Sequence, residues 1–381
     1  MILTKLFNEF FKSEKSGGIF LIFCTVGSLV LTNIFSNQYS DIWNLPIADN
    51  TLVHWINDGL MAIFFLLIGL ELEREIYIGE LSDFRNALLP LFAALGGMLV
   101  PAGIYLLFNW EGEGRAGAGI PMATDIAFAL GVLSMLGNRV PASLKVFLTA
   151  LAVIDDLGAI LVIAVLYTNT INLVSLGTAI AIFVVLLILN RLRVHTLWPY
   201  LIGGLFMWYF MLHSGVHATI TGVLLAFAIP FGSGDDKSPS YILQNVLHIP
   251  VAYFILPLFA LANTCILMNG DSFQALGSMV SIGIIAGLLI GKPFGIVLFS
   301  YLTTVFKISS LPEDLKWTHI IGAGILAGIG FTMSIFITLL AFDEPSVIDT
   351  SKMSVLFASL LAGVTGFLWL KSALPKTTNV Q

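Results

Sequence analysis

The stretch LAVIDDLGAI, residues 151–160, places two adjacent acids inside a long apolar run. From Val146 to Asn190 the only charged residues are Asp155 and Asp156. The run is continuously apolar rather than alternating, which favours a membrane-spanning helix. An ionised carboxylate at the centre of a bilayer costs about 2.5–3.5 kcal/mol on insertion scales. Two such groups side by side therefore indicate a functional site inside the membrane.

The composition of the whole chain fits the same interpretation. Of its 381 residues, 57% are hydrophobic and only 10% are charged, and the mean hydropathy is +0.96. A soluble domain carries about 25% charged residues, so a water-exposed surface is hard to build from this sequence. Continuous apolar runs such as IAIFVVLLIL (180–189) and GLLIGKPFGIVLF (287–299) lack the alternation of a membrane β-barrel. We expect an all-α polytopic membrane protein.

The apolar runs predict twelve spans, because a bilayer core needs about 20 apolar residues per helix. Spans seven and eight are the shortest of these. The predicted spans are residues 17–34, 54–72, 87–108, 116–136, 146–167, 174–190, 197–212, 215–231, 246–264, 280–303, 319–342 and 353–371.

The distribution of basic residues predicts the orientation. With the N-terminus in the cytoplasm, fourteen of the 17 Lys and Arg residues fall on the cytoplasmic side. Only Arg115 and Lys352 fall outside, and Lys292 lies within a span. Cytoplasmic loops carry an excess of Lys and Arg, so this asymmetry predicts that both termini are cytoplasmic.

Two segments outside the spans have structure of their own. Residues 1–16 place apolar side chains at helical spacing, which predicts a helix on the membrane surface before the first span. The longest external connection, residues 36–52, has loosely alternating residues around Pro46. It is interpreted as an external loop or a β-hairpin; the residues favour the loop slightly, and a hairpin would suit an oligomer contact.

Two further charges lie deep in predicted spans, Asp125 and Lys292. Lys292 is the only charge between Ser272 and Phe306. It lies roughly 17 Å from either end of its helix, too far for the lysine side chain to reach the membrane surface. It therefore needs a water-filled cavity or a carboxylate at similar depth, and Asp125, Asp155 and Asp156 are available. Charges inside a membrane usually mark ion pathways or buried pairs.

Spans four and eleven both contain helix-breaking sequences at mid-depth. They read GAGIPMATDIAFALG (117–131) and GAGILAGIGFTMSIF (322–336). Interrupted segments in the two halves of a transporter indicate an ion site, because broken helices expose carbonyls, amides and half-helix dipoles. Close helix packing through small residues is the alternative for Gly324 and Gly328.

These motifs resemble the NhaA family of bacterial sodium/proton antiporters, and the likeness runs from about Ser13 to Leu370. The segments that carry it are ATDIAFALGVL (123–133), LAVIDDLGAI, SGVHAT (214–219), AGLLIGKPFGI (286–296) and GIGFTMSIF (328–336). The family is a standard example of inverted-repeat transporters. The resemblance implies one transporter domain over residues 1–381, twelve spans, inverted repeats at 86–167 and 280–372, and crossed, interrupted spans four and eleven. It also implies the bacterial inner membrane and makes a homodimer through residues 36–52 more credible.

The resemblance assigns roles to the buried charges. It makes Asp155 and Asp156 the carboxylates that bind the proton and the ion, and it pairs Lys292 with Asp155. Thr124 and Asp125 fall at the first helix break. We expect sodium ligands from Asp156, Asp155 and Thr124, and the transported ions to be Na⁺, possibly Li⁺, and H⁺. No cofactor and no nucleic-acid partner are expected; the surroundings are membrane lipid.

A pair of adjacent acids suits sodium/proton exchange. Sodium is a hard cation that prefers oxygen ligands, and one ionised carboxylate balances its charge. Neighbouring helix positions point about 100° apart, so one acid can take the ion while the other meets the lysine. Burial and mutual repulsion disfavour ionisation, whereas a nearby lysine favours it. Sodium and protons then compete for the same oxygens, and two protons released per sodium make the exchange electrogenic.

The pH response departs from the family pattern. Members commonly carry a charged cluster at the start of span nine, but this chain reads YILQNVLHIP (241–250), with no charge before His248. The acids at the end of span two, Glu71 and Glu75, are kept, and Glu73 is added. The predicted pH-responsive residues are therefore Glu71, Glu75, His217 and His248.

Two other functions remain open from the residues. A sodium-coupled symporter of organic solutes would have a related fold and a larger polar cavity. An intramembrane aspartyl protease would need two membrane acids and a Gly-x-Gly-Asp motif, which residues 232–235 match. That match lies in a polar loop, and no Tyr-Asp dipeptide is present, so the protease is the weaker alternative.

Overall fold

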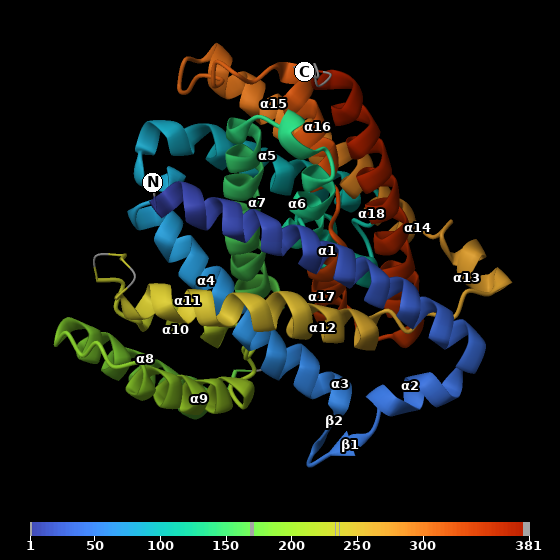
Figure 1. The fold of residues 1–381 in the computed structure, drawn as a ribbon. Helices are drawn as coiled ribbons and strands as arrows, with labels where there is room; N and C mark the ends of the chain where they lie inside the picture. The colour runs from blue at the N-terminus through green and yellow to red at the C-terminus, as the bar shows by residue number, and fades with distance from the viewer. Residues whose placement is uncertain (1, 168–170, 233, 236, 376–381) are drawn as a thin grey trace.

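The computed structural model describes residues 2–167, 171–232, 234–235 and 237–375, and these form an almost wholly helical bundle (Figure 1). The α-helices are α1 (Ile2–Phe35), α2 (Asn37–Trp43), α3 (Leu52–Trp55), α4 (Met61–Tyr77), α5 (Phe84–Phe108), α6 (Ile126–Ser134), α7 (Ala142–Leu166), α8 (Leu173–Arg191), α9 (Trp198–Leu212), α10 (Ile220–Ala228), α11 (Pro239–Pro250), α12 (Leu256–Asn263), α13 (Gly270–Ala275), α14 (Met279–Ala286), α15 (Lys292–Val305), α16 (Trp317–Ala327), α17 (Phe331–Ala341) and α18 (Pro345–Ala373). The 3₁₀ segments are η2 (Glu80–Ser82), η3 (Glu113–Met122) and η4 (Gly137–Arg139), and the π-helical turns are η1 (Ile56–Leu60), η5 (Val251–Ile255) and η6 (Gly287–Gly291).

Within the described residues, nine helical runs are long and apolar enough to cross a membrane, and α16 with α17 makes a tenth if the bent pair is one span. Predicted spans seven and eight are the two that fall short. Helix α9 has 15 residues and α10 has 9. The protein is therefore a multi-pass helical membrane protein, while the count of twelve stays a prediction.

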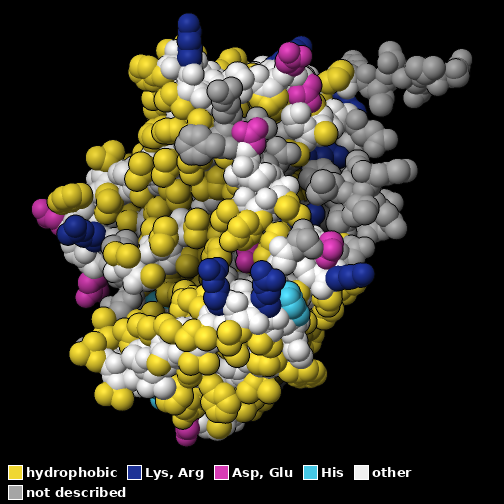
Figure 2. Space-filling view, turned by 90° about the vertical axis from the view of Figure 1, so that its left-hand side faces the viewer, with side chains coloured by type: hydrophobic (Ala, Val, Ile, Leu, Met, Phe, Trp, Pro, Cys, Tyr) yellow, Lys and Arg dark blue, Asp and Glu magenta, His cyan; other side chains and the backbone are white. Residues whose placement is uncertain are grey.

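The burial pattern differs from that of a water-soluble fold, because large apolar side chains cover the outside as well as fill the core. Large apolar side chains such as Leu107 (82% exposed) and Leu173 (78%) lie on the outside, and yellow apolar atoms cover much of the face in Figure 2. In contrast, the charged residues Asp155, Asp156 and Lys292 are only 1%, 0% and 0% exposed. Lipid is as apolar as a protein core, so the outer surface stays apolar and the polar groups turn inward.

The N-terminal region differs from the prediction in its details. Helix α1 runs from Ile2 to Phe35 without a break, so the predicted surface helix and the first span form one helix. Residues 36–52 contain α2 and a short antiparallel hairpin of β1 (Pro46–Ile47) and β2 (Asn50–Thr51), seen at the bottom of Figure 1. The hairpin alternative is thus the one present in the structure. Contact with a second copy stays a prediction.

Helices α5 and α15 pack at unusually close range, and this positions the buried lysine. A Cβ atom at Gly96 would lie 2.2 Å from the carbonyl oxygen of Gly295, and one at Gly295 would lie 2.1 Å from that of Gly96. Any larger residue at either position would force the helices apart. Lys292 begins α15, one turn from this contact, so the close approach fixes the lysine against α5.

Candidate ion-exchange site

The first interruption lies between η3 and α6. Residues Gly117, Gly119 and Pro121 favour a 3₁₀ segment over a regular α-helix, and η3 runs for 10 residues. Such long 3₁₀ runs are uncommon and often mark a functional hinge. Ala123 is extended, and Asp125 then caps α6, its Oδ1 accepting from the Phe128 backbone N–H at 2.9 Å. An aspartate is among the preferred caps of a helix N-terminus.

The second interruption lies between α16 and α17. The two helices are bent by 45° around residues 328–330. A Cβ atom at Gly328 would lie 2.5 Å from the carbonyl oxygen of Leu288. Glycine is therefore required here because the backbone approaches η6 closely. Both predicted breaks are present at the predicted residues.

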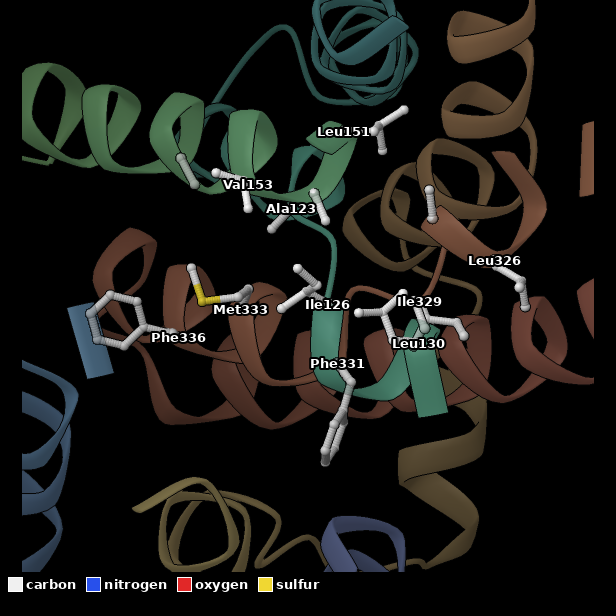
Figure 3. Close-up of a cluster of buried hydrophobic side chains, with 14 of the residues drawn as sticks. Ala123, Ile126, Leu130, Leu151, Val153, Leu326, Ile329, Phe331, Met333 and Phe336 are labelled. Atoms are coloured by element: carbon white, nitrogen blue, oxygen red, sulfur yellow. The ribbon is translucent and has the colours of Figure 1, made fainter. Parts of the chain in front are cut away.

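The two breaks lie against each other. The Asp125 N–H donates to the Ile329 carbonyl at 2.7 Å. The hydroxyl and backbone N–H of Thr332 donate to Asp125 Oδ2 at 2.5 and 3.1 Å. In Figure 3, Ile126 and Leu130 accordingly lie close to Ile329 at the junction. Asp125 thus faces the positive N-terminal ends of both α6 and α17, where a carboxylate is electrostatically favoured.

Lys292 faces negatively charged and carbonyl groups, whereas Asp125 faces the positive ends of helices. It follows the π-helical turn η6, a distortion that is frequent at functional sites. Its Nζ lies 2.8 Å from Asp155 Oδ2 and also donates to the carbonyl of Met122, at the end of η3. The Thr124 hydroxyl lies 2.7 Å from the same Asp155 oxygen and 3.0 Å from the Ala327 carbonyl, and it donates to one of them at a time. The pairing of Lys292 with Asp155 is therefore present.

Asp156 differs from its neighbour. It is fully buried, and neither of its carboxylate oxygens has a hydrogen-bond partner among the described residues. Asp155 Oδ1 is unpartnered in the same sense. The described residues contain no group of three His, Cys, Asp or Glu side chains that could hold a metal ion. A cation here would be held by these two acids together with hydroxyl and carbonyl oxygens such as those of Thr124.

Two of the predicted pH-responsive residues meet in one small cavity. Glu71 and His248 both line a space of about 30 Å³ between α1, α4, α6 and η5. A cavity of this size holds a water molecule. Ile126, next to Asp125, lines the same cavity, and Glu71 is near enough to Asp156 for electrostatic interaction. The cavity therefore lies next to the first helix break, at the start of α6.

The other two predicted residues are not brought to the acids. Glu75 lies near the end of α4 and is partly exposed. His217 lies in the turn between α9 and α10, where its Nε2 donates to the Tyr167 carbonyl at 2.7 Å. Its charged neighbour is Asp58, which also lies 3.2 Å from His54. Asp58 lies in η1, the turn before α4, and is roughly 20 Å from Glu71 along the helix axis by the helical rise.

Two interactions at the site did not follow from the sequence. Thr332 bonds Asp125 across the two breaks, and its position just after Gly330 is the signal that could have indicated this. Glu73 is 4% exposed, and its Oε2 accepts from the Ser240 hydroxyl at 3.0 Å. Ser240 lies in the first turn of α11, so an added acid of α4 contacts the residue just before the stretch in which the expected charges are missing.

The membrane helices, the two facing breaks and the buried charges define an ion-coupled secondary transporter, a class for which the NhaA proteins are a standard example. Residues 8–370 match the family model described as Na⁺/H⁺ antiporter 1. The chain is 61% identical to the Na⁺/H⁺ antiporter NhaA of Flavobacterium psychrophilum, over 99% of this chain and 98% of that protein. It is 58% identical to the NhaA of Cytophaga hutchinsonii, over 98% and 97% of the two chains. The chain belongs to the Na⁺/H⁺ antiporter 1 family.

This membership makes the protein a secondary transporter that exchanges sodium and protons, and not an enzyme. The protease alternative is therefore wrong, and Asp235 of its motif lies in the connection between α10 and α11. A solved sodium proton antiporter, MjNhaP1 from Methanocaldococcus jannaschii, is similar over 95% of this chain and 97% of its own. With a TM-score of 0.48 and 14% identity, that likeness carries no argument about the site.

Proposed function

We propose that Asp155 and Asp156 form the site at which this antiporter exchanges cytoplasmic Na⁺ for external H⁺. The observation that carries the proposal is the buried, unpartnered carboxylate of Asp156 beside an Asp155 that is paired with Lys292. A buried carboxylate without a partner is costly unless it binds a proton or a cation. Asp156 therefore holds one or the other throughout the cycle.

The same geometry gives Asp155 and Lys292 a role in coupling. When sodium binds, Asp155 Oδ1 and the Thr124 hydroxyl add oxygen ligands to those of Asp156. Lys292 then shares its partner with the ion, which weakens the lysine–aspartate pair. Release of sodium restores that pair and returns one proton to Asp156; the exchange is electrogenic if Asp155 also takes up a proton during the cycle, and one-for-one if it does not. Protons and sodium compete for one set of oxygens, and the site needs no cofactor; Li⁺ is a second cargo of the same chemistry.

The proposed architecture supports alternating access. Twelve spans, with inverted repeats at 86–167 and 280–372 and with spans four and eleven crossing at their breaks, would place the site near mid-membrane. Half-helices that begin and end at the site supply opposed dipoles, which Asp125 and Lys292 balance. Both termini are proposed to be cytoplasmic, in a bacterial inner membrane, and the dimer contact is proposed at residues 36–52.

Exchange in proteoliposomes tests the proposal. A sodium gradient should drive proton movement, read by a pH-sensitive dye, in the unmodified protein and in Asp343→Asn, whose side chain is exposed. Asp156→Asn should fold and insert, because asparagine keeps the shape, but it should not exchange ions, because an amide cannot bind and release a proton near neutral pH. Robust exchange by Asp156→Asn would refute the assignment.

A further inference from the structure

We propose that Tyr105 and Tyr167 are positioning residues for ion exchange, and that they hold the start of η3 so that Thr124, just beyond its other end, stays in place. The inference rests on the exchange site proposed above, because Thr124 is one of the oxygen ligands of that site. The two tyrosines themselves lie away from the ion. Tyr167 follows the last residue of α7 and lies roughly 16 Å beyond Asp156 by the helical rise.

The segment η3 needs support from its surroundings. It runs for 10 residues in the 3₁₀ conformation, whereas 3₁₀ runs longer than about 3–4 residues are uncommon because their hydrogen-bond geometry is poorer. Side chains from the surrounding elements donate to its carbonyls along its length. They belong to α5, the end of α7, α17 and α15, so parts of the chain that are distant in sequence fix η3 together. Among the described residues the donors are Tyr105 to Gly114, Tyr167 to Ala116, Ser334 to Ile120 and Lys292 to Met122.

The two tyrosines are buried where they meet η3. Tyr105 is 0% exposed, and its hydroxyl donates to the Gly114 carbonyl at 2.7 Å. Tyr167 is 7% exposed, and its hydroxyl donates to the Ala116 carbonyl at 2.7 Å. A buried tyrosine hydroxyl usually finds a hydrogen-bond partner. Here the partner is the backbone of a segment that lacks the regular bonds of an α-helix, so the contact stabilises that segment.

The glycines of η3 leave room for these hydroxyls. A Cβ atom at Gly117 would lie 2.3 Å from the Tyr105 hydroxyl oxygen. One at Gly119 would lie 2.8 Å from that of Tyr167. A larger residue at either position would push the tyrosine away from the carbonyl that it binds. The glycines therefore serve the two tyrosine contacts as well as interrupting the helix.

The other end of η3 adjoins the exchange site. The Met122 carbonyl accepts from Lys292, and the Thr124 hydroxyl lies 2.7 Å from Asp155 Oδ2. In the proposed cycle sodium weakens the pair of Lys292 and Asp155, so the lysine holds Met122 less firmly at that step. The tyrosine contacts involve no group that titrates near neutral pH, and they persist. Because ligands that are already held in place lose less freedom on binding, the two contacts raise the affinity of the site for sodium.

Phenylalanine variants test the two hydroxyls. Tyr105→Phe and Tyr167→Phe keep the ring and remove the donor. Each should weaken the apparent sodium affinity by about fivefold, as expected for one hydrogen bond, while the maximal rate per folded protein stays close to that of the unmodified protein. Exchange rates in proteoliposomes at varied sodium concentration give both quantities.

Tyr200→Phe on α9 is the matched control. Tyr200 is also 0% exposed and donates to a backbone carbonyl, that of Val194, away from both helix breaks. This variant should lose a comparable amount of thermal stability and keep its sodium affinity. The comparison separates positioning of the site from a purely structural role, which would lower stability alone.

A second pair of variants tests the fit between Gly119 and Tyr167. Gly119→Ala places a methyl group against the Tyr167 hydroxyl and should weaken the apparent sodium affinity. Adding Tyr167→Phe removes the obstructing oxygen, and the other neighbours of that methyl group lie at 3.2 Å or more. The double variant should therefore be no weaker than Tyr167→Phe alone, instead of showing the sum of two losses. Gly103→Ala on α5, where nothing lies within 4 Å, is the control and should keep its sodium affinity.

The outcomes distinguish this inference from the proposed site. Loss of exchange in Asp156→Asn, together with unchanged sodium affinity in Tyr105→Phe and Tyr167→Phe, would overturn the role of the tyrosines and leave the site intact. Additive losses in the double variant of Gly119 and Tyr167 would also overturn that role. Robust exchange by Asp156→Asn would overturn the site and this inference with it.

Discussion

The Nζ atom of Lys292 lies 2.8 Å from Oδ2 of Asp155, and neither side chain has any exposed surface. This one contact makes the two adjacent acids unequal. The charge of Asp155 is balanced by the lysine, whereas Asp156 keeps both oxygens free of partners among the described residues. The asymmetry leads to predictions about stability, coupling and pH dependence.

Removing the lysine should destabilise the protein through the aspartate that it leaves behind. Lys292→Met leaves Asp155 buried without its partner, and breaking a buried pair from one side costs about 3–5 kcal/mol. Adding Asp155→Asn should recover most of the loss, because the uncompensated charge is then gone. Thermal unfolding in detergent measures both effects, with the exposed Lys371→Met as the control. Equal stability of Lys292→Met and the unmodified protein would mean that the lysine has no structural partner.

The contact between Thr332 and Asp125 should matter for both stability and transport. Thr332→Val removes the 2.5 Å hydrogen bond and keeps the backbone N–H contact. Hydrogen bonds to charged groups contribute about 1.5–3 kcal/mol, so thermal stability should fall and exchange should slow. Thr338→Val is a matched control on α17, since that buried hydroxyl donates to the Ser334 carbonyl of its own helix. If both variants behaved alike, the contact across the breaks would have no special role.

Exchange should respond to membrane potential if both acids release protons for one sodium. One net charge then moves per cycle, and each charge couples to about 2.3 kcal/mol per 100 mV. An inside-negative potential should accelerate sodium efflux from proteoliposomes clamped with potassium and valinomycin. Equal rates with and without the potential would indicate one-for-one exchange, with Asp155 permanently paired to Lys292.

The pH profile should be shallow and set by competition at the acids. Protons leave the carboxylates as pH rises, so the apparent sodium affinity should increase with pH while the maximal rate at saturating sodium changes little.

Ser240, Gln244 and His248 recur every four residues along α11, which puts them on one helix face. Ser240 of that face bonds Glu73, and Gln244 is 8% exposed.

This arrangement predicts that two substitutions which add charge will affect the pH profile to different degrees. Gln244→Glu adds a buried acid on the face that meets α4 and should shift or steepen the profile. Asn245→His adds an exposed group and should do less. Proteoliposome assays from about pH 6 to 9, a range that brackets the histidine value, measure apparent affinity and maximal rate. An abrupt switch in the maximal rate of the unmodified protein at saturating sodium would contradict competition and reveal a separate gate.

Local features of the chain were predictable from the sequence where a short stretch determines them. The break before Asp125 follows from Gly117, Gly119 and Pro121, and the break after Ala327 follows from Gly328 and Gly330. Predicted spans seven and eight were less certain because α9 and α10 are short, so hydropathy alone marks them weakly. The hairpin at residues 46–51 has only two residues per strand, and such a short alternation does not distinguish a strand from a loop.

The sequence by itself determined that this is a helical membrane protein with three acids and a lysine held deep inside it. Hydropathy and the cost of burying charge are properties of each segment and its depth, and they can be evaluated along the chain. The residues alone left open which acid meets Lys292; the family resemblance implied Asp155, and the structure shows that pair. Only the tertiary structure decided that Thr332 holds Asp125 and that Glu71 and His248 share a cavity. Asp125, Asp155 and Asp156 all lay at a suitable depth, and the choice among them depended on helix rotation and on close approaches such as Gly96 to Gly295. Those depend on packing between segments distant in sequence, which no local pattern encodes.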